Sequence, residues 1–197
     1  MPKVGMEKVR RQQLIDATLS SIELHGLQGT TIVTISKLAG VSSGIISHYF
    51  GGKAGLLEAC VQYLLHSLRL ELIENLGKQQ TDHKGRLYAI IDTNFGGLQQ
   101  SPKAAVTWLA FWNQSMHSEE LARLQRINAA RLVSNLKYSL RHLVEAEQVS
   151  WCAEMLAAQI DGFWLRAALS KNEKAYEAGV KTCKRLIDQV LKDYPKV

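Results

Sequence analysis

The chain has 197 residues, 46% hydrophobic and 21% charged, which suffices for a packed core and excludes a disordered protein. Its 24 basic and 18 acidic residues give a net charge of +6, which permits an anionic partner without establishing one. No charge-free apolar run reaches the roughly 18 residues of a membrane span, and the N-terminal segment lacks the apolar stretch of a signal peptide. Three widely spaced cysteines without a CxxC pair predict reduced thiols in a cytoplasmic protein.

Helical periodicity dominates the chain, and no segment shows the period-two alternation of a strand. Glycine, serine and threonine at the segment ends indicate where helices stop and start. The expected helices run over about 6–25, 31–39, 42–50, 53–76, 84–99, 102–116, 118–145, 148–170 and 173–194. We therefore expect an all-α protein.

Two short helices near the N-terminus have the spacing of a helix-turn-helix. Thr31 is placed to cap the first of them, and Gly40 supplies the tight turn before the second. Apolar residues at helical spacing are expected to pack the pair: Ile32, Ile35, Leu38, Ala39, Val41, Ile45, Ile46 and Phe50. Short helices joined by a glycine turn occur in many all-α proteins, so the spacing alone does not establish DNA binding.

The second short helix and its flanks carry the residues expected to contact DNA. Short polar groups on its outer face can approach base edges, and Tyr49 can reach a phosphate. Lys53 opens the next helix, where free backbone N–H groups and the helix dipole also favour an anion. The full set of expected DNA contacts is Thr31, Ser42, Ser43, Gly44, Ser47, His48, Tyr49 and Lys53.

This stretch resembles the DNA-binding domain of the TetR family of bacterial repressors. The similarity rests on the Thr31 cap, the "AGVS" turn, the aromatic pair Tyr49-Phe50 and Lys53; Gly51-Gly52 depart from it, where polar or charged residues are expected. The resemblance implies an N-terminal three-helix DNA-binding domain over 1–53, with the helix-turn-helix at about 31–50. A helical effector-binding and dimerisation domain then covers 54–197. The implied molecule is a homodimer on a palindromic DNA operator, with no cofactor, metal or membrane.

Further segments are similar to the choline-responsive members of that family, which repress glycine betaine synthesis. They are "PKVGMEKVRRQQLIDATLSSI", "GVSSGIISHYFGGKAGLLEA", "WLAFWNQSMH" and "LAAQIDGFWLRAALS". This similarity runs nearly end to end and includes the variable ligand domain. It implies repression of the genes for choline uptake and glycine betaine biosynthesis, relief of repression by choline, and a role in osmotic stress.

"WLAFW" places Trp108, Phe111 and Trp112 on one helical stripe, and Asp161 and Trp164 share a stripe in "IDGFW". For any single ring, core packing is the simpler interpretation. A quaternary ammonium has no N–H, so a protein must hold it with aromatic faces and a nearby anion. With the resemblance, the five residues are expected to form a choline cage. The Asp161 carboxylate could equally pair with an arginine or belong to a subunit interface.

The homodimer is expected to be built from the last two helices. The last one carries an apolar stripe whose steps alternate between four and three residues: Tyr176, Val180, Cys183, Ile187, Val190 and Tyr194. Such a 3.5-residue seam suits a helical bundle between subunits, although it could pack within one chain. The preceding helix is rich in small residues that permit close approach of two backbones: Ala153, Ala157, Ala158, Gly162, Ala167 and Ala168.

Three other functions remain open. A TetR-type regulator could respond to a different cationic or hydrophobic molecule, and a DNA-binding protein could lack an effector altogether. A helical di-metal enzyme needs Glu-x-x-His pairs, and no histidine here has a glutamate three residues before it. HExxH, GxSxG and P-loop motifs are also missing from the sequence. A mobility-shift assay with and without small cations separates these alternatives.

Overall fold

The computed structural model describes residues 6–77 and 82–196, which are almost entirely helical. The α-helices are α1 (Met6–Gly29), α2 (Ile32–Ala39), α3 (Gly44–Phe50), α4 (Lys53–Gly77), α5 (His83–Phe95), α6 (Pro102–Ser115), α7 (Glu119–Leu140), α8 (Val149–Ser170) and α9 (Glu173–Asp193). Two 3₁₀ turns, η1 (Gly97–Gln100) and η2 (Ala146–Gln148), complete the order. The all-α prediction is confirmed. Within the described ranges, no helix combines the length and apolarity that crossing a membrane requires.

Two predicted helices are shorter than expected. The helix expected over 84–99 ends at Phe95, because the backbone is extended at Gly96 and continues into η1. The helix expected over 118–145 ends at Leu140, because the following backbone pairs with the C-terminal segment. There the Lys196 N–H donates to the Leu143 carbonyl at 3.0 Å. The predicted break within residues 77–85 lies partly outside the described residues.

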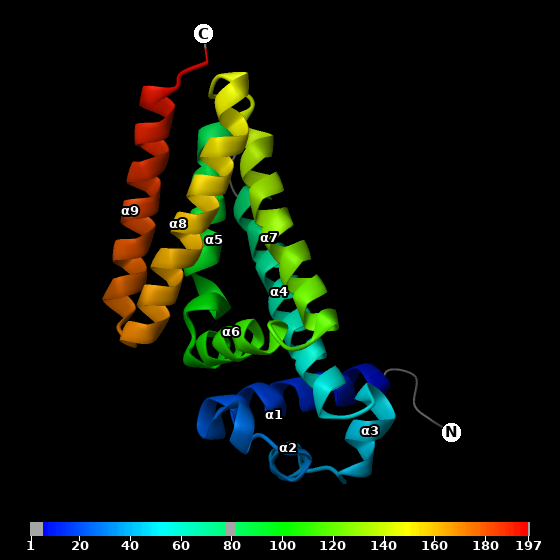
Figure 1. Cartoon of the computed structure of the whole chain (residues 1–197). Helices are drawn as coiled ribbons and strands as arrows, with labels where there is room; N and C mark the ends of the chain where they lie inside the picture. Colours follow the sequence, from blue (N-terminus) through cyan, green and yellow to red (C-terminus); the bar gives the residue numbers. More distant parts are fainter. Residues whose placement is uncertain (1–5, 78–81, 197) are drawn as a thin grey trace. The chain divides into compact units, whose positions relative to one another are not determined.

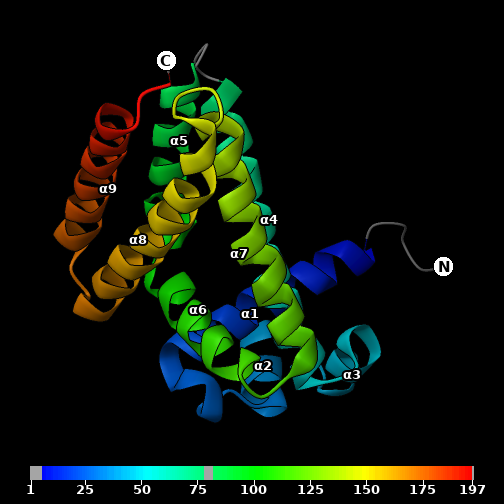
Figure 2. The same cartoon turned by 45° about the horizontal axis from the view of Figure 1, so that its top comes forward.

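The chain divides into two compact units, which we describe separately. The first unit comprises Met1–His66 and Pro102–Ala122. Its α6 packs against α1 (Figure 2). Side chains from α1 to α4 form one core: Leu14, Ile15, Ala17, Leu19, Ile35, Ala39, Ile46, Leu56 and Cys60. The buried faces of α2 and α3 pack into this core, which holds the two helices in place.

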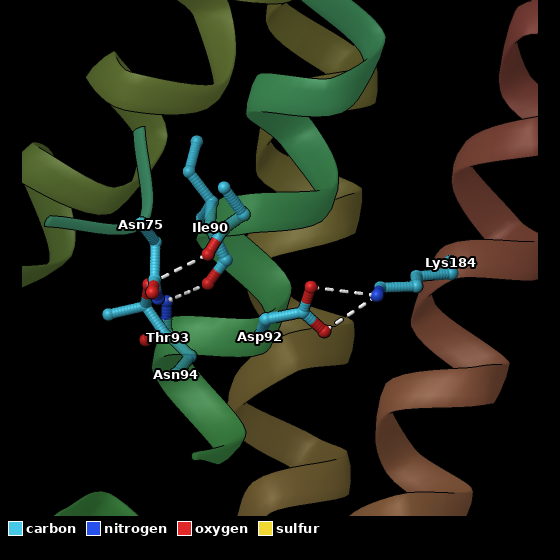
Figure 3. A network of polar contacts seen from close by, with 7 residues as sticks. Asn75, Ile90, Asp92, Thr93, Asn94 and Lys184 are labelled. Atoms are coloured by element: carbon cyan, nitrogen blue, oxygen red, sulfur yellow. Dashed lines mark hydrogen bonds and ion pairs between the residues drawn. The ribbon is translucent and has the colours of Figure 1, made fainter. Parts of the chain in front are cut away.

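The second unit comprises Ser67–Ser101 and Arg123–Val197. In it α8 and α9 lie side by side (Figure 1), joined by a turn at Lys171. Figure 3 shows that α5 contacts two other helices through polar side chains. Asn75 of α4 donates to the Thr93 hydroxyl at 3.1 Å. On the other side, Lys184 of α9 pairs with Asp92 at 2.6 Å. These contacts fix α5 between its neighbours. These two units reflect which residues pack together. They do not test the expected division into a DNA-binding domain over 1–53 and an effector-binding domain over 54–197, which stays a prediction.

The apolar stripe of α9 lies inside the chain. Four of its members are at most 5% exposed: Tyr176, Cys183, Ile187 and Val190. Gly179 lies among them, and a Cβ there would come within 2.5 Å of the Phe95 ring of α5. The α9 stripe therefore forms part of the core of the second unit, and its interpretation as the intersubunit seam is wrong for these four residues.

Candidate DNA-binding surface and ligand site

The local sequence fixes both ends of α2. The Thr31 hydroxyl accepts from the Thr34 N–H at 3.1 Å, and the Thr34 hydroxyl accepts from the Thr31 N–H at 2.8 Å, which is a reciprocal capping box. Gly40 ends the helix in the left-handed conformation, with φ 63°. The N–H groups of Gly40 and Val41 then bond to carbonyls in the last turn of α2, at 3.3 and 3.1 Å. The turn between the two short helices therefore has one defined geometry.

The two faces of α3 differ as the sequence predicts. Ile46 is fully buried, and Ile45, Tyr49 and Phe50 pack against the core beside it. The opposite side is exposed and polar, and comprises Ser42, Ser43, Gly44, Ser47 and His48. Ser43 occupies the cap position without a side-chain cap hydrogen bond.

One predicted core contact is wrong. Leu38 was expected to pack α2 but is 46% exposed, because it lies on the outer side of that helix. It lines a shallow groove against α1 together with Val9 and Gln12.

Arg11 of α1 holds the end of α3. Its guanidinium donates to the Tyr49 carbonyl at 2.6 Å and lies 4.5 Å from the centre of the Phe50 ring. Gln13, further along α1, donates to the Ala39 carbonyl at the end of α2, also at 2.6 Å. A charge-assisted bond at a helix C-terminus also complements the helix dipole. The sequence carries no local signal of this contact, since the two residues lie 38 positions apart.

Lys53 lies half-buried at the start of α4, as expected, but its ammonium donates to the Leu27 carbonyl at 2.8 Å. Its phosphate contact therefore stays a prediction. The structure explains the preceding Gly51-Gly52, where the TetR pattern has polar residues. Both glycines have positive φ angles, 69° and 126°, which side chains disfavour. These positions therefore shape the turn between α3 and α4.

The aromatic residues of α6 lie in the first unit with graded burial. Phe111 is fully buried and Trp108 is 5% exposed, with their ring centres 5.7 Å apart in an edge-to-face arrangement. Trp112 is half-buried. Core packing is thus the observed role of Phe111, and Trp112 is the most exposed of the three.

Asp161 and Trp164 lie on α8 in the second unit. The Trp164 indole N–H donates to the Gln99 carbonyl of η1 at 3.2 Å, and its ring is 6% exposed. The Asp161 side chain is exposed, yet neighbouring protein atoms desolvate the carboxyl enough to raise its pKa to about 6. Within residues 6–77 and 82–196, Asp161 forms no hydrogen bond or ion pair, so the alternative of an arginine partner finds no support.

Each half of the expected cage is therefore assembled within its own unit, and the complete cage stays a prediction. Phe95, a weaker candidate for the cage, is 1% exposed and belongs to the core beside Gly179. In the described part of the chain, no three His, Cys, Asp or Glu side chains are grouped to hold a metal ion.

The small residues of α8 that were expected at the subunit interface divide between two faces. Ala153, Ala157 and Ala167 are buried inside the chain. Ala158 and Gly162 lie instead on a second apolar stripe along α8. It repeats every three or four residues and is left unburied by the chain itself: Trp151, Met155, Ala158, Gly162, Leu165 and Leu169. Trp151 is 52% exposed and Leu169 63% exposed. The same repeat was available in the sequence, but only burial distinguishes this stripe from the internal one on α9.

Comparison with known proteins covers both parts of the chain. The family described as bacterial regulatory proteins, tetR family, matches residues 14–60, and BetI-type transcriptional repressor, C-terminal, matches residues 83–192. The HTH-type transcriptional regulator BetI of Vibrio campbellii is 46% identical over 198 residues, covering 100% of both chains. The protein of the same name from Vibrio vulnificus is 50% identical over 171 residues, 86% of each chain.

Solved structures share the fold. A transcriptional regulator from Pseudomonas aeruginosa PAO1 is 27% identical with a TM-score of 0.80, over 94% of this chain and 91% of that one. A regulator from Saccharomonospora viridis, solved in complex with choline, has a TM-score of 0.82 at 16% identity, over 96% of this chain and 100% of that one.

Proposed function

The chain belongs to the TetR family of bacterial transcriptional regulators, with a BetI-type C-terminal domain, and we propose that within this family it is a choline-responsive repressor of the genes for choline uptake and glycine betaine synthesis. It is a DNA-binding regulator and not an enzyme, which removes the di-metal alternative. The observation that carries the proposal is the match of residues 83–192, the effector half, to the BetI-type domain. A regulator of chromosomal genes works in the cytoplasm.

Operator binding is assigned to α3. Its exposed face presents small polar side chains, Ser43, Ser47 and His48, which let the helix approach base edges in the major groove. The Arg11 bond to the Tyr49 carbonyl holds the helix in a fixed orientation. Tyr49 and Lys53 would contact phosphates on either side, and the capped Thr31 would contact the backbone at the start of α2.

The effector is an organic cation, and an aromatic ring and a carboxylate would hold it. Trp112 is half-buried, and the exposed Asp161 has a carboxyl whose pKa is raised by desolvation. A desolvated carboxylate without a counter-ion is costly, and a quaternary ammonium removes that cost without needing a hydrogen bond. Trp108, Phe111 and Trp164 would complete the cage from their buried positions. A different organic cation of similar size is the second candidate, because the same groups would attract it.

We assign the homodimer to the exposed stripe of α8, which α9 flanks. Ala158 and Gly162 at its centre permit close approach of two helices, and Leu169 at its end is largely exposed in one chain. A two-fold dimer would present two α3 helices to successive major grooves of a palindrome, roughly 34–36 Å apart. Choline binding would change that spacing and relieve repression.

Calorimetric titration of choline into the purified protein tests the effector assignment. Trp112→Ala and Asp161→Asn should each weaken binding about tenfold or more, equivalent to roughly 1.4 kcal/mol. Trp164→Ala should do the same, provided that its circular dichroism matches the wild type, since that ring is also part of the core. The control is Glu154→Gln, an equal charge change at an exposed position of the same helix. Unchanged affinity in both Trp112→Ala and Asp161→Asn would place the effector elsewhere.

A further inference from the structure

Five basic side chains of the second unit, none of them assigned a role above, gather beside Tyr138 and the Arg141 carbonyl. They come from the start of α5, the turn that follows α7 and the C-terminal segment, and we call them the basic cluster: His83, Arg86, Arg141, His142 and Lys196. Tyr138 itself is 48% exposed, so the cluster is accessible to solvent.

The geometry of the basic cluster is close. The imidazole rings of His83 and His142 stack with centres 4.0 Å apart and planes 11° apart. The guanidinium groups of Arg141 and Arg86 lie 4.5 and 5.0 Å from the centre of the Tyr138 ring. The Lys196 ammonium donates to the Arg141 carbonyl at 3.0 Å. The start of α5, the turn that follows α7 and the C-terminal segment therefore contribute like charges to one small area.

These charges are not balanced by the chain. Two other lysines of the second unit do have acidic partners, since Lys84 pairs with Asp188 and Lys184 with Asp92, both at 2.6 Å. None of the five basic residues forms an ion pair within the described ranges. The Asp82 carboxylate, adjacent in sequence, instead caps α5 by accepting from the Gly85 N–H at 2.6 Å.

Two further observations show that positive charge and an unused donor are concentrated here. The Nε of Arg86 is buried without a hydrogen-bond partner, although its Nη2 donates to Asn135 at 3.2 Å. The pKa of His142 is lowered, first by desolvation and then by the charges of His83, Arg141 and Lys196. The positive neighbours disfavour protonation of His142, and the Arg86 Nε–H has no acceptor. A negative ligand would relieve both, because it offers an acceptor and offsets the positive charge.

We propose that the basic cluster is a second ligand site, which binds the phosphate group of a small polyvalent anion. Guanidinium groups match the oxygens of phosphate geometrically and keep their charge at every physiological pH. The stacked imidazoles supply N–H donors beside them, and the N-terminal end of α5 adds its positive dipole. The regulator would thus sense an anion at this site and an organic cation at its effector site.

Titration calorimetry with sodium pyrophosphate, at constant ionic strength, tests the site. Saturable binding is expected, and Arg141→Gln should weaken it roughly tenfold or more, because one charge-assisted fork is lost. The matched control is Arg131→Gln, an identical change at an exposed position of α7 outside the cluster, which should bind as the wild type. Inorganic phosphate and ATP as separate titrants distinguish a free phosphate from a nucleotide as the source.

Imidazole proton resonances of His83 and His142 provide a readout independent of affinity, and they should shift on addition of pyrophosphate to the wild type. If Arg141→Gln and Arg131→Gln weaken pyrophosphate binding equally, the loss of affinity reflects the net charge of the protein and not this site. That result would overturn the proposal. Binding that Lys53→Ala removes while Arg141→Gln retains would place the anion on the DNA-binding surface, which also overturns it. So would the absence of saturable binding up to millimolar pyrophosphate.

Discussion

The Asp161 side chain is exposed, yet desolvation by neighbouring atoms raises the pKa of its carboxyl to about 6. Choline should require the ionised carboxylate, so its affinity should fall as the pH falls through about 6. At pH 5 the dissociation constant should be about tenfold higher than at pH 8, since one pKa unit corresponds to a factor of ten. Calorimetry across this pH range measures the change.

Asp161→Asn is the control for that pH dependence. It should bind choline weakly and with nearly the same affinity at pH 5 and pH 8. Because the raised pKa favours the protonated carboxyl in the folded state, the native carboxyl contributes stability below about pH 4 that is lost as the pH rises through about 6. Asp161→Asn should therefore raise the melting temperature at pH 8. An equally strong pH dependence in the variant would show that another group titrates.

Lys53 tests the DNA contact at the residue scale. Lys53→Ala should weaken binding to all DNA sequences alike and reduce the slope of log affinity against log salt by about one unit, because one phosphate contact is lost. Lys174→Ala, an exposed lysine of α9, removes the same charge and should leave the slope unchanged. Ser47→Ala and His48→Ala should alter base preference instead. A wild-type salt slope in Lys53→Ala would contradict the phosphate role.

At the scale of elements, the junction of α3 and α4 depends on the close approach of Gly55 to the Phe50 carbonyl. A Cβ at Gly55 would lie 2.0 Å from that oxygen, whereas a Cβ at Gly44 would meet no atom within 4 Å. Gly55→Ala should therefore cost about 1–3 kcal/mol of unfolding free energy, as overpacking does. Gly44→Ala should be close to neutral. Thermal unfolding of both variants checks this, and equal stability would show that the α4 start can shift freely.

The helical elements of this fold could largely be predicted from the sequence because their ends are encoded locally. Thr31 and Gly40 act on backbone groups within a few residues, so the limits of α2 were predictable. Long-range contacts could not be predicted in this way. The hydrogen bond from Arg11 to the Tyr49 carbonyl, for example, has no local sequence signature. The stripes of α8 and α9 have the same period, so the sequence could not show which of them the chain buries.

Some features of the candidate sites could also be predicted from local sequence, whereas others depend on tertiary packing. Exposure of Ser47 and His48 followed from the position of Ile46 in the core, which helical periodicity predicts. The cage prediction depended on residue types, and burial now ranks Trp112 above Phe111 as a ligand contact. The basic cluster was not predicted, because its histidines lie 59 positions apart in the numbering and meet only through the packing of α5 and α7.

At the scale of the whole molecule, the exposed stripe of α8 predicts a dimer. Ala158→Glu places a charge at the centre of the stripe, so it should yield monomers at micromolar concentration and weaken operator binding. Ala130→Glu, the same change at an exposed position of α7, should remain dimeric. Size-exclusion chromatography with light scattering distinguishes the two. A monomeric wild-type protein, or a dimeric Ala158→Glu, would contradict the assignment.

The most direct test of the choline-responsive repressor is a mobility-shift titration with the DNA upstream of the choline uptake and glycine betaine genes. The protein should retard a palindromic fragment in the absence of choline, and choline should release it in proportion to occupancy. Asp161→Asn should retard the same fragment and remain bound at the choline concentration that releases the wild type. Retardation that saturating choline leaves unchanged in the wild-type protein would contradict the account.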